Sequence, residues 1–337
     1  MANIRDVAKK AGVSVATVSR VMTGDAPVNE QTRRRVERAM ATLDYAPNAF
    51  ARSLAFNRSF SVGLLISHLA GPFIGRLLTT VETTLRDRQM SLIVASGQSD
   101  AEQEQAAIHF LLSKRCDGLL VHADGMSDAA LGKLADRVPL VVLNRHVDAL
   151  ADQCVVADNV LGGYLATRHL IDLGHQRIAC LTGSLFKQDA HHRLAGFQRA
   201  MDEAGLDVPE GAVVEGNFTE ASGAAGVRTL HERGVAFTGL VTGNDEMAIS
   251  AMGALRAQGY ALPHDISVVG YDDEMYARHM VPSLTTIHAP VEEMANYGVQ
   301  LITALIDQPE QAIAHQNFPP RLVVRGSTAP PAKVGLT

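Results

Sequence analysis

Cysteine is scarce in this sequence, and the three that occur are far apart. Cys116, Cys154 and Cys180 lie in separate apolar runs, and no two of them have the spacing of metal ligands. We expect three buried free thiols, which are typical of a reducing compartment and exclude a disulfide framework.

Long hydrophobic runs and a leader sequence are also missing. No apolar run approaches the roughly 18 residues that a membrane-spanning helix needs. The N-terminus lacks the basic stretch, apolar run and small-residue cleavage site of a signal peptide. We therefore expect a cytoplasmic protein. Its 337 residues, 47% hydrophobic and 20% charged, are typical of a globular chain of about two or three domains.

Motifs that carry catalysis or bind cofactors are absent as well. The sequence has no G-x-S-x-G, Walker loop, G-x-G-x-x-G or H-E-x-x-H. The adjacent pair His191-His192 is a poor metal clamp because neighbouring side chains diverge. The pair Asp272-Asp273 resembles the two carboxylates of a glycosidase, but adjacent side chains at a strand end diverge in the same way. We expect no cofactor, no metal and no enzymatic activity, and an α/β enzyme acting on a sugar stays a minor alternative.

A basic total charge is missing too, and the formal net charge of -6 argues at first against a nucleic-acid partner. The charge is unevenly distributed. Residues 1–58 carry ten Lys or Arg against five Asp or Glu, a net +5, which leaves -11 for the rest of the chain. A basic end on an acidic body indicates an anionic partner for that end alone.

The basic end has the spacing of a helix-turn-helix. Ile4 begins an apolar helical face that continues to Ala11, and Gly12 ends this helix in a left-handed turn. Ser14 is the expected N-cap of a second helix at residues 15–22, and a third helix is expected at residues 30–43. A steep turn at Gly12 would let the second helix enter a DNA major groove. A plain three-helix bundle with a solvated basic face is the alternative.

The side chains of the second helix suit DNA. The hydroxyls of Ser14, Thr17 and Ser19 can donate to phosphate oxygens. Arg20 can reach a guanine edge or a phosphate, and Val15 and Ala16 offer only apolar contact, such as to thymine methyl groups. We therefore expect duplex DNA as the anionic partner.

A different pattern begins at Ser61, where short apolar runs alternate with amphipathic helices. Continuous apolar strands between helices predict parallel sheets that are covered on both faces, and two such blocks predict two α/β subdomains. Two late strands, near 285–287 and 322–324, could return the chain to either sheet. The earlier strands are expected at residues 62–66, 92–94, 118–121, 140–143, 177–181, 239–241 and 266–270.

Polar residues follow several of these strands. In parallel sheets, ligands bind outside the carboxyl ends of the strands. The residues at those ends suit a polyhydroxylated ligand, because carboxylates accept from hydroxyls and arginine donates to oxygens. Polar caps of strands are the structural alternative. The residues are His122, Asn144-Arg145, Asn244-Asp245 and Asp272-Asp273.

The stretch NIRDVAKKAGVSVATVSRVM at residues 3–22 resembles the DNA-binding head of the LacI/GalR bacterial transcription regulators. The resemblance continues through LDYAPNAFARSLAFNRS at residues 43–59 and then nearly to the end of the chain. It includes TRHLIDLGHQRIACLTG, RLAGFQRAMDEAGL, GNDEMAISAMGALRAQG and ISVVGYDDEMYARHMVPSLTTI. Within the family, the likeness is to the galactose-repressor and β-glucoside-repressor branch.

The resemblance implies a fold and domain boundaries. It implies an all-α helix-turn-helix head followed by a periplasmic-binding-protein-like body of two doubly wound, parallel-sheet α/β subdomains. The head is expected at residues 1–46 and a hinge helix or linker at 47–59. The first subdomain is expected at 60–158 and 288–319, the second at 159–287 and 320–329, and a tail at 330–337.

The resemblance also implies two sets of contact residues. The segment after Pro47 is expected to form a hinge helix on operator DNA, with Leu54 wedged into the minor groove and Ala51 at the close approach of paired hinges. An ordinary linker is the alternative. The full DNA-contact set is Ile4, Ser14, Val15, Ala16, Thr17, Ser19, Arg20, Asn48, Ala51 and Leu54. The effector set is Phe73, His122, Arg145, Arg193, Phe218, Asn244 and Asp272. An alignment shifted by one residue would put Asn144 in the place of Arg145.

The function expected from this resemblance is a sequence-specific repressor. A homodimer is expected, because the tail lacks the heptads that tetramerise some members. Such a dimer would bind a near-palindromic operator. A small sugar, such as galactose or a β-glucoside, would bind between the subdomains and control operator affinity. The alternatives are a sugar receptor without a DNA function and a regulator in which the ligand promotes DNA binding.

Overall fold

The computed structural model describes residues 2–23, 27–45, 56, 58–308 and 316–332. The chain divides into two compact units, one of Met1–Ser61 with Arg115–Asp117 and one of Val62–Lys114 with Gly118–Thr337. Each unit has a hydrophobic core of its own. The finer domain boundaries expected from the sequence stay predictions.

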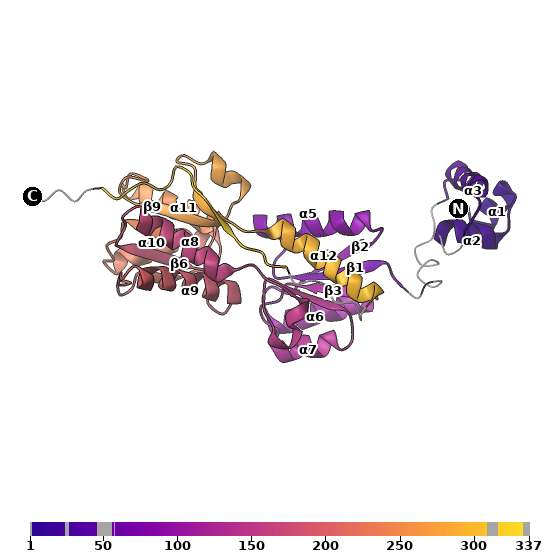
Figure 1. Ribbon diagram of the computed structural model, residues 1–337, viewed down its shortest axis with the longest axis horizontal. Coiled ribbons are helices and arrows are strands. Elements are labelled where there is room, and N and C mark those ends of the chain that lie inside the picture. The colour runs from indigo at the N-terminus through magenta and orange to yellow at the C-terminus, as the bar shows by residue number, and fades with distance from the viewer. Residues whose placement is uncertain (1, 24–26, 46–55, 57, 309–315, 333–337) are drawn as a thin grey trace, which may run out of the picture. The chain divides into compact units, whose positions relative to one another are not determined.

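The head is a three-helix unit with the expected turn. The Asn3 side chain caps the first helix in a capping box with Asp6, and Gly12 ends this helix at a φ of 63°. The buried side chains Val7, Val18 and Val36 join the three helices in one small core. The helices are α1 (Ile4–Ala11), α2 (Val15–Thr23) and α3 (Glu30–Thr42) (Figure 1).

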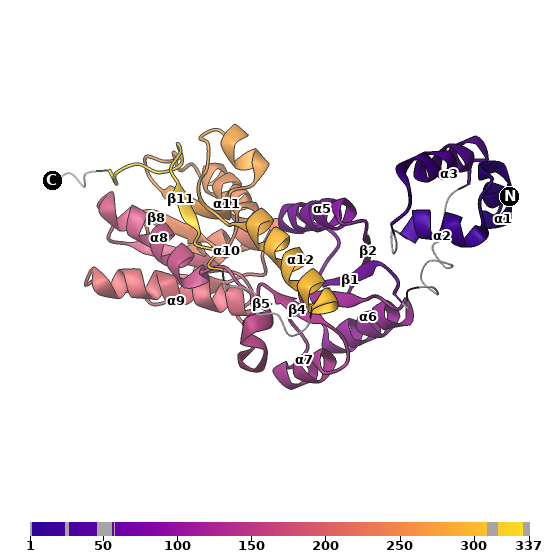
Figure 2. The same cartoon turned by 45° about the vertical axis from the view of Figure 1, so that its right-hand side comes forward.

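The second unit contains two sheets, and the first has the strand order β2-β1-β3-β4-β5. The pairs β1–β3, β3–β4 and β4–β5 are parallel, as the continuous apolar runs predict. Its strands are β1 (Ser61–Ile66), β2 (Ser91–Ser96), β3 (Gly118–Val121), β4 (Leu140–Leu143) and β5 (Cys154–Val155). Its helices are α5 (Pro72–Asp87), α6 (Ala101–Ser113), α7 (Asp128–Ala135) and α12 (Val291–Asp307), and the short helix η1 (Asp148–Gln153) precedes β5. Figure 2 shows α12 lying beside α5.

The second sheet has the strand order β11-β10-β9-β8-β6-β7. Both late strands join this sheet, but β11 runs antiparallel to β10, so the sheet is parallel except at that edge. Its strands are β6 (Ile178–Thr182), β7 (Val213–Glu215), β8 (Gly239–Thr242), β9 (Ser267–Asp272), β10 (Thr285–His288) and β11 (Arg321–Val323). Its helices are α8 (Asn159–Asp172), α9 (Gln188–Glu203), α10 (Glu220–Glu232) and α11 (Asp245–Ala257), with the short helix η2 (Met275–His279).

We call β1–β5 with α5, α6, α7 and α12 the first lobe, and β6–β11 with α8–α11 the second lobe. The chain passes between the lobes three times, after β5, after β10 and after α12. The first two passages leave from the ends of strands β5 and β10, and the third leads into strand β11. Three segments of the chain therefore connect the two lobes. The described helices include none that is long and apolar enough to cross a membrane.

Helices α8 and α9 pack unusually closely in the second lobe. A Cβ atom at Gly163 would overlap the carbonyl oxygen of Arg193, and one at Gly196 would overlap the carbonyl oxygen of Val160. The absence of side chains at these two positions lets the helix backbones touch. Because the backbone of Arg193 lies against Gly163, this contact helps to set the position of Arg193 in the second lobe.

Replacing Gly163 tests this close approach. We expect Gly163→Ala to destabilise the second unit by about 1–3 kcal/mol, because the backbone carbonyl of Arg193 cannot move aside cheaply. The matched control is Gly253→Ala on α11, where no atom lies within 4 Å of the added Cβ and better helix propensity gains up to about 1 kcal/mol. Urea unfolding monitored by circular dichroism measures both. Equal effects of the two substitutions would contradict the close packing.

Candidate functional site

Helix α2 of the head has one buried and one exposed face. Val18 has no exposed surface and belongs to the head's core. Val15 is 41% exposed, and Ala16 and Arg20 are exposed as well. The three positions with the strongest expected base contacts therefore stand clear of the head's own packing.

The hydroxyl residues lie at the N-terminal turn of the same helix. Thr17 N–H donates to Ser14 Oγ at 3.1 Å, and the two hydroxyls lie 2.9 Å apart. Ser19 is half-buried, and Ile4 is half-buried against the head's core, so packing occupies part of its side chain. The remaining predicted DNA contacts lie outside the described residues: Asn48, Ala51 and Leu54.

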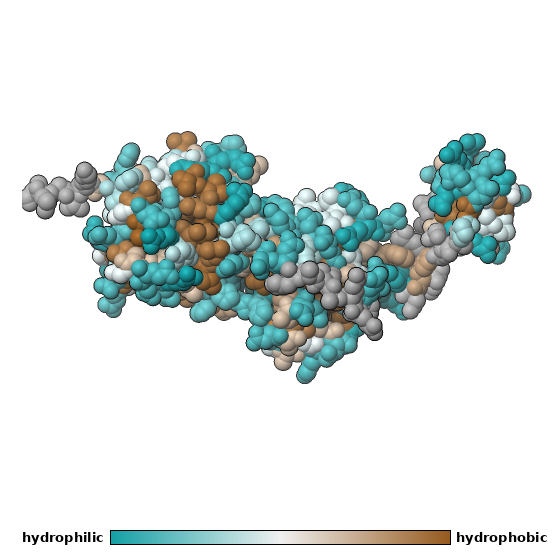
Figure 3. Space-filling model, viewed as in Figure 1, coloured by the Kyte–Doolittle hydropathy of each residue, from teal (hydrophilic) through white to brown (hydrophobic). Residues whose placement is uncertain are grey.

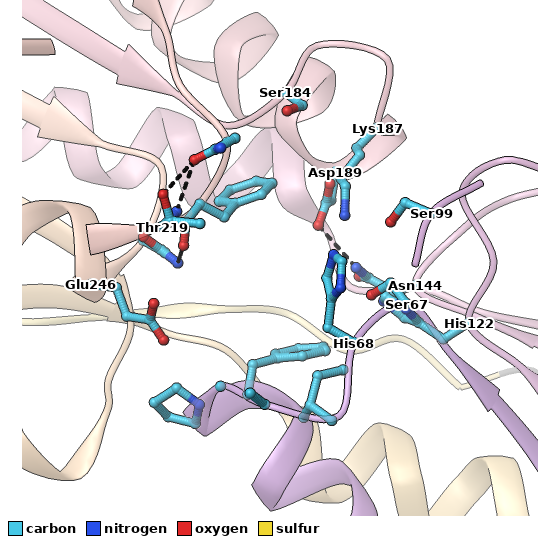
Figure 4. Close-up of a pocket in the computed structure, with 18 of the residues that line it drawn as sticks. Ser67, His68, Ser99, His122, Asn144, Ser184, Lys187, Asp189, Thr219 and Glu246 are labelled. Carbon is cyan, nitrogen blue, oxygen red and sulfur yellow. Dashed lines mark hydrogen bonds between the residues drawn. The ribbon is translucent and has the colours of Figure 1, made fainter. Parts of the chain in front are cut away.

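The second unit contains a cavity of about 680 Å³ that is lined by residues of both lobes (Figure 4). It lies at the carboxyl ends of the strands, as expected for ligand sites of parallel sheets. Five of the seven predicted effector residues line it: Phe73, His122, Arg193, Phe218 and Asn244.

Arg193 is the most constrained of these side chains. Its Nε donates to Asn159 Oδ1 at 3.0 Å, and its Nη1 donates to the carbonyl oxygen of Gly243 at 2.6 Å. The guanidinium carbon lies 3.6 Å from the centroid of the Tyr271 ring and 5.5 Å from that of Phe218. Arg193 therefore presents a fixed cation to the cavity.

The aromatic and amide groups beside it are fixed in the same way. Phe218 adopts a φ of 66°, and a Cβ at Gly183 would overlap its ring. Asn244 caps α11 by accepting the N–H of Met247 at 3.0 Å, and its Nδ2 donates to the carbonyl oxygen of Phe218 at 2.9 Å. Such strained and fully determined positions are typical of ligand sites.

The first lobe contributes an aromatic and a polar edge. The rings of Phe73 and His122 lie 5.9 Å apart, and His122 is buried at the end of β3. Among the described residues, nothing hydrogen-bonds to His122 Nδ1. The nitrogen is itself buried.

Three contacts join the lobes near the cavity, and sequence reasoning missed all of them. Lys187 Nζ lies 2.8 Å from Asp124 Oδ2. Asn144 Nδ2 donates to Asp189 Oδ2 at 3.0 Å, a hydrogen bond that Figure 4 shows. Gln188 Oε1 accepts the N–H of His146 at 2.6 Å. Burial alone would raise the pKa of Asp124, but His122 and Lys187 beside it hold that pKa below its usual value. The only sequence signal was that the second-lobe partners, residues 187–189, stand together at the start of α9, just before Arg193.

Arg145 does not line the cavity, contrary to the expectation. Its guanidinium donates to the carbonyl oxygens of Ala123 and Met126 at 3.3 and 2.8 Å and pairs with Asp128 at 2.5 Å. These acceptors at the start of α7 turn the side chain away. Asn144, the residue that a shift of one position puts in its place, lines the cavity instead.

Asp272 lies behind Arg193 and does not line the cavity either. It ends β9 at a φ of 106°, and its Oδ1 is 3.8 Å from Arg193 Nη1. Burial raises the pKa of Asp272 to about 7, although the positive charge of Arg193 opposes the shift. Its structural role is to support Arg193 from behind.

Arg76, which the sequence analysis did not identify either, joins the two lobes near the chain segments that connect them. This α5 side chain donates to Glu292 Oε2 at 2.7 Å and to the carbonyl oxygen of Asp272 at 2.9 Å. Its Nη1 also lies 3.6 Å from the carboxylate of Glu274 in the second lobe. Arg76 thus holds the end of β9 against the first lobe.

A helix-turn-helix head joined to a two-lobed α/β body with a cavity between the lobes defines a DNA-binding transcriptional regulator. Residues 3–48 match the family model of bacterial regulatory proteins, lacI family, and residues 167–328 match that of a periplasmic binding protein-like domain. The chain belongs to the lacI family of bacterial regulatory proteins.

Relatives and solved structures agree with this assignment over nearly the whole chain. The transcriptional regulator GalR of Escherichia coli K12 is 38% identical over 333 residues, which cover 98% of this chain and 97% of GalR. The ribose operon repressor of the same strain is 38% identical over 330 residues, or 97% of this chain and 100% of that protein. The lac repressor dimer bound to operator and the anti-inducer ONPF has a TM-score of 0.86 at 31% identity, covering 97% of this chain and 99% of that one.

The burial of Asp272 predicts a pH-dependent stability. Because the pKa is about 7 in the folded protein and about 4 in an unfolded chain, the folded state binds a proton that the unfolded state has lost. This stabilisation is complete below about pH 4 and disappears as the pH rises to about 7. The amide of Asp272→Asn does not titrate, so this variant does not lose that stabilisation. As the pH rises from about 4 to about 7, the variant should therefore gain roughly 2–4 kcal/mol of stability relative to the parent. Urea unfolding at several pH values measures the difference, and a constant difference would contradict the buried carboxyl.

Proposed function

We propose that this protein is a sequence-specific repressor whose operator affinity is controlled by a small sugar bound between the two lobes. The cavity carries this proposal, because it combines the fixed donors of Arg193 with the ring of Phe218 and the amide of Asn244. The head supplies the surface for DNA, and the cytoplasm is where it would meet an operator.

The chemistry of the cavity suits a polyhydroxylated ring. The guanidinium donates a fork of N–H groups to hydroxyl or ring oxygens, and carboxylates such as Asp189 accept from hydroxyls. The faces of Phe73 and Phe218 can cover the apolar C–H side of a sugar. A hexose or a glycoside, such as galactose or a β-glucoside, is the proposed ligand class. The name of the ribose operon repressor supports a sugar without choosing among sugars.

The exposed face of α2 supports a direct reading of DNA. Val15 and Ala16 would contact thymine methyl groups, and Arg20 would contact a guanine edge or a phosphate. The hinge residues Asn48, Ala51 and Leu54 would bind and bend the centre of the operator. Ser14, Thr17, Ser19 and Ile4 complete the proposed interface, mainly through the phosphate backbone.

We further propose that the protein acts as a homodimer on a near-palindromic operator. The lac repressor structure described above is a dimer bound to operator. Figure 3 shows apolar residues on the surface of the second lobe. In this lobe Met275 is 72% exposed and Val281 is 83% exposed. Contact of such apolar side chains with water is unfavourable, and a dimer interface that covered them would remove that contact.

Ligand and operator would be coupled through the arrangement of the lobes. The pairs Lys187–Asp124 and Asn144–Asp189 hold the lobes together beside the cavity, and Arg76 holds them at the passages. A sugar that competes for Asp189 or Asn144 changes this balance. A ligand that prefers one arrangement shifts the population toward it, and operator affinity then changes by the same factor as sugar affinity.

Operator binding with and without sugar tests the proposal. The operator is first isolated by selection from random duplexes with the full-length protein. We expect the effective sugar to weaken operator binding at fixed salt by about 5- to 150-fold, measured by fluorescence anisotropy. An affinity that no hexose, pentose or glycoside changes would contradict the coupling, and a sugar that strengthens binding would identify a corepressor instead.

A further inference from the structure

The cavity is larger than a single sugar ring requires. Twelve water molecules occupy roughly 360 Å³ in the liquid, and the twelve covalently bonded non-hydrogen atoms of a hexose need less than that. The cavity volume is about 680 Å³. A free hexose held by Arg193 and Phe218 would therefore leave about half of the space to water.

Phe186 gives the additional space an aromatic surface. It lies in the loop between β6 and α9, lines the cavity and is nevertheless 64% exposed. Its neighbour Lys187, which bridges the lobes to Asp124, has its ammonium 5.9 Å from the centroid of the Phe186 ring. A second ring of the ligand could stack on this exposed aromatic face, as rings do on aromatic side chains.

The charges of the cavity favour an uncharged occupant. Both cations that line it already face carboxylates: Lys187 faces Asp124 at 2.8 Å, and Arg193 faces Asp272 at 3.8 Å. Glu246 also lines the cavity, and no ion pair or hydrogen bond of its carboxylate is found within the described part of the chain. Figure 4 shows this carboxylate directed toward the open space, apart from the hydrogen-bonded pairs. It can accept hydrogen bonds from hydroxyl groups, and its negative charge repels a phosphate or a carboxylate.

We infer that the effector is an uncharged glycoside with two rings, a disaccharide or an aryl glycoside. Its first ring lies between Arg193 and Phe218, and its second ring stacks on Phe186, while Glu246 accepts a hydroxyl and excludes phosphorylated sugars. This inference rests on the proposed sugar-controlled function and narrows its ligand class.

Calorimetric titration of the full-length protein with matched ligands tests the inference. For both glucose and galactose, the set contains the free sugar, its phenyl β-glycoside, a disaccharide (cellobiose or lactose) and the 6-phosphate. We expect one or both two-ring ligands of the preferred configuration to bind about tenfold or more tightly than the free sugar. The phenyl glycoside and the disaccharide distinguish an aryl from a sugar second ring. The 6-phosphate should bind more weakly than the free sugar.

Two variants assign the effects to residues. Phe186→Ala should reduce the ratio of two-ring to one-ring affinity to about one. Phe110→Ala is the matched control, because Phe110 is 45% exposed on α6 and does not line the cavity, and it should preserve that ratio. Glu246→Gln should bring the affinity for the 6-phosphate closer to that for the free sugar.

The outcomes separate this inference from the function on which it depends. Equal affinity for the free sugar and its two-ring derivatives overturns the inference but leaves a sugar effector in place. An unchanged affinity ratio in Phe186→Ala, or a 6-phosphate that binds more tightly than the free sugar, also overturns it. If no member of the set binds while operator binding is intact, the proposed sugar control itself is contradicted.

Discussion

The placement of one largely buried cation, Arg193, is the constraint on which the cavity between the lobes depends. A guanidinium removed from water must be hydrogen-bonded and charge-balanced, or its burial is strongly unfavourable. Here Asn159, the carbonyl of Gly243, the ring of Tyr271 and the carboxyl of Asp272 meet that requirement. These partners come from three different elements of the second lobe, so Arg193 is oriented before any ligand arrives.

Other features of the second lobe follow from this placement. Helices α8 and α9 must touch, which explains the glycines at 163 and 196. Strand β9 must end at Asp272 with its unusual backbone, where Arg76 of the first lobe grips the carbonyl. Arg193 therefore faces the side chain of Asp272, and Arg76 donates to the backbone carbonyl of the same residue. A ligand bound to the guanidinium of Arg193 is thus connected, through Asp272 and Arg76, to the contact between the two lobes.

Much of the fold and part of the site were predictable from the sequence. Gly12 and Ser14 determined the head, and continuous apolar runs determined the parallel strands, because both signals are local. Arg145 was misplaced because a shift of one residue cannot be resolved without knowing which side chain the start of α7 captures. Lys187–Asp124 and Arg76–Glu292 were missed because their partners are 63 and 216 residues apart, and no periodicity links such positions. The antiparallel direction of β11 was hidden for the same reason.

We propose that a single pre-oriented cation, Arg193, connects sugar binding to the release of DNA. Arg193→Lys tests it most directly, because lysine keeps the charge but cannot make the fork of hydrogen bonds. The measurement is operator affinity of the full-length variant across a titration of the effective sugar. We expect a variant that binds operator in the absence of sugar but needs at least about tenfold more sugar for release. A variant that releases operator at the parent's sugar concentration would contradict it.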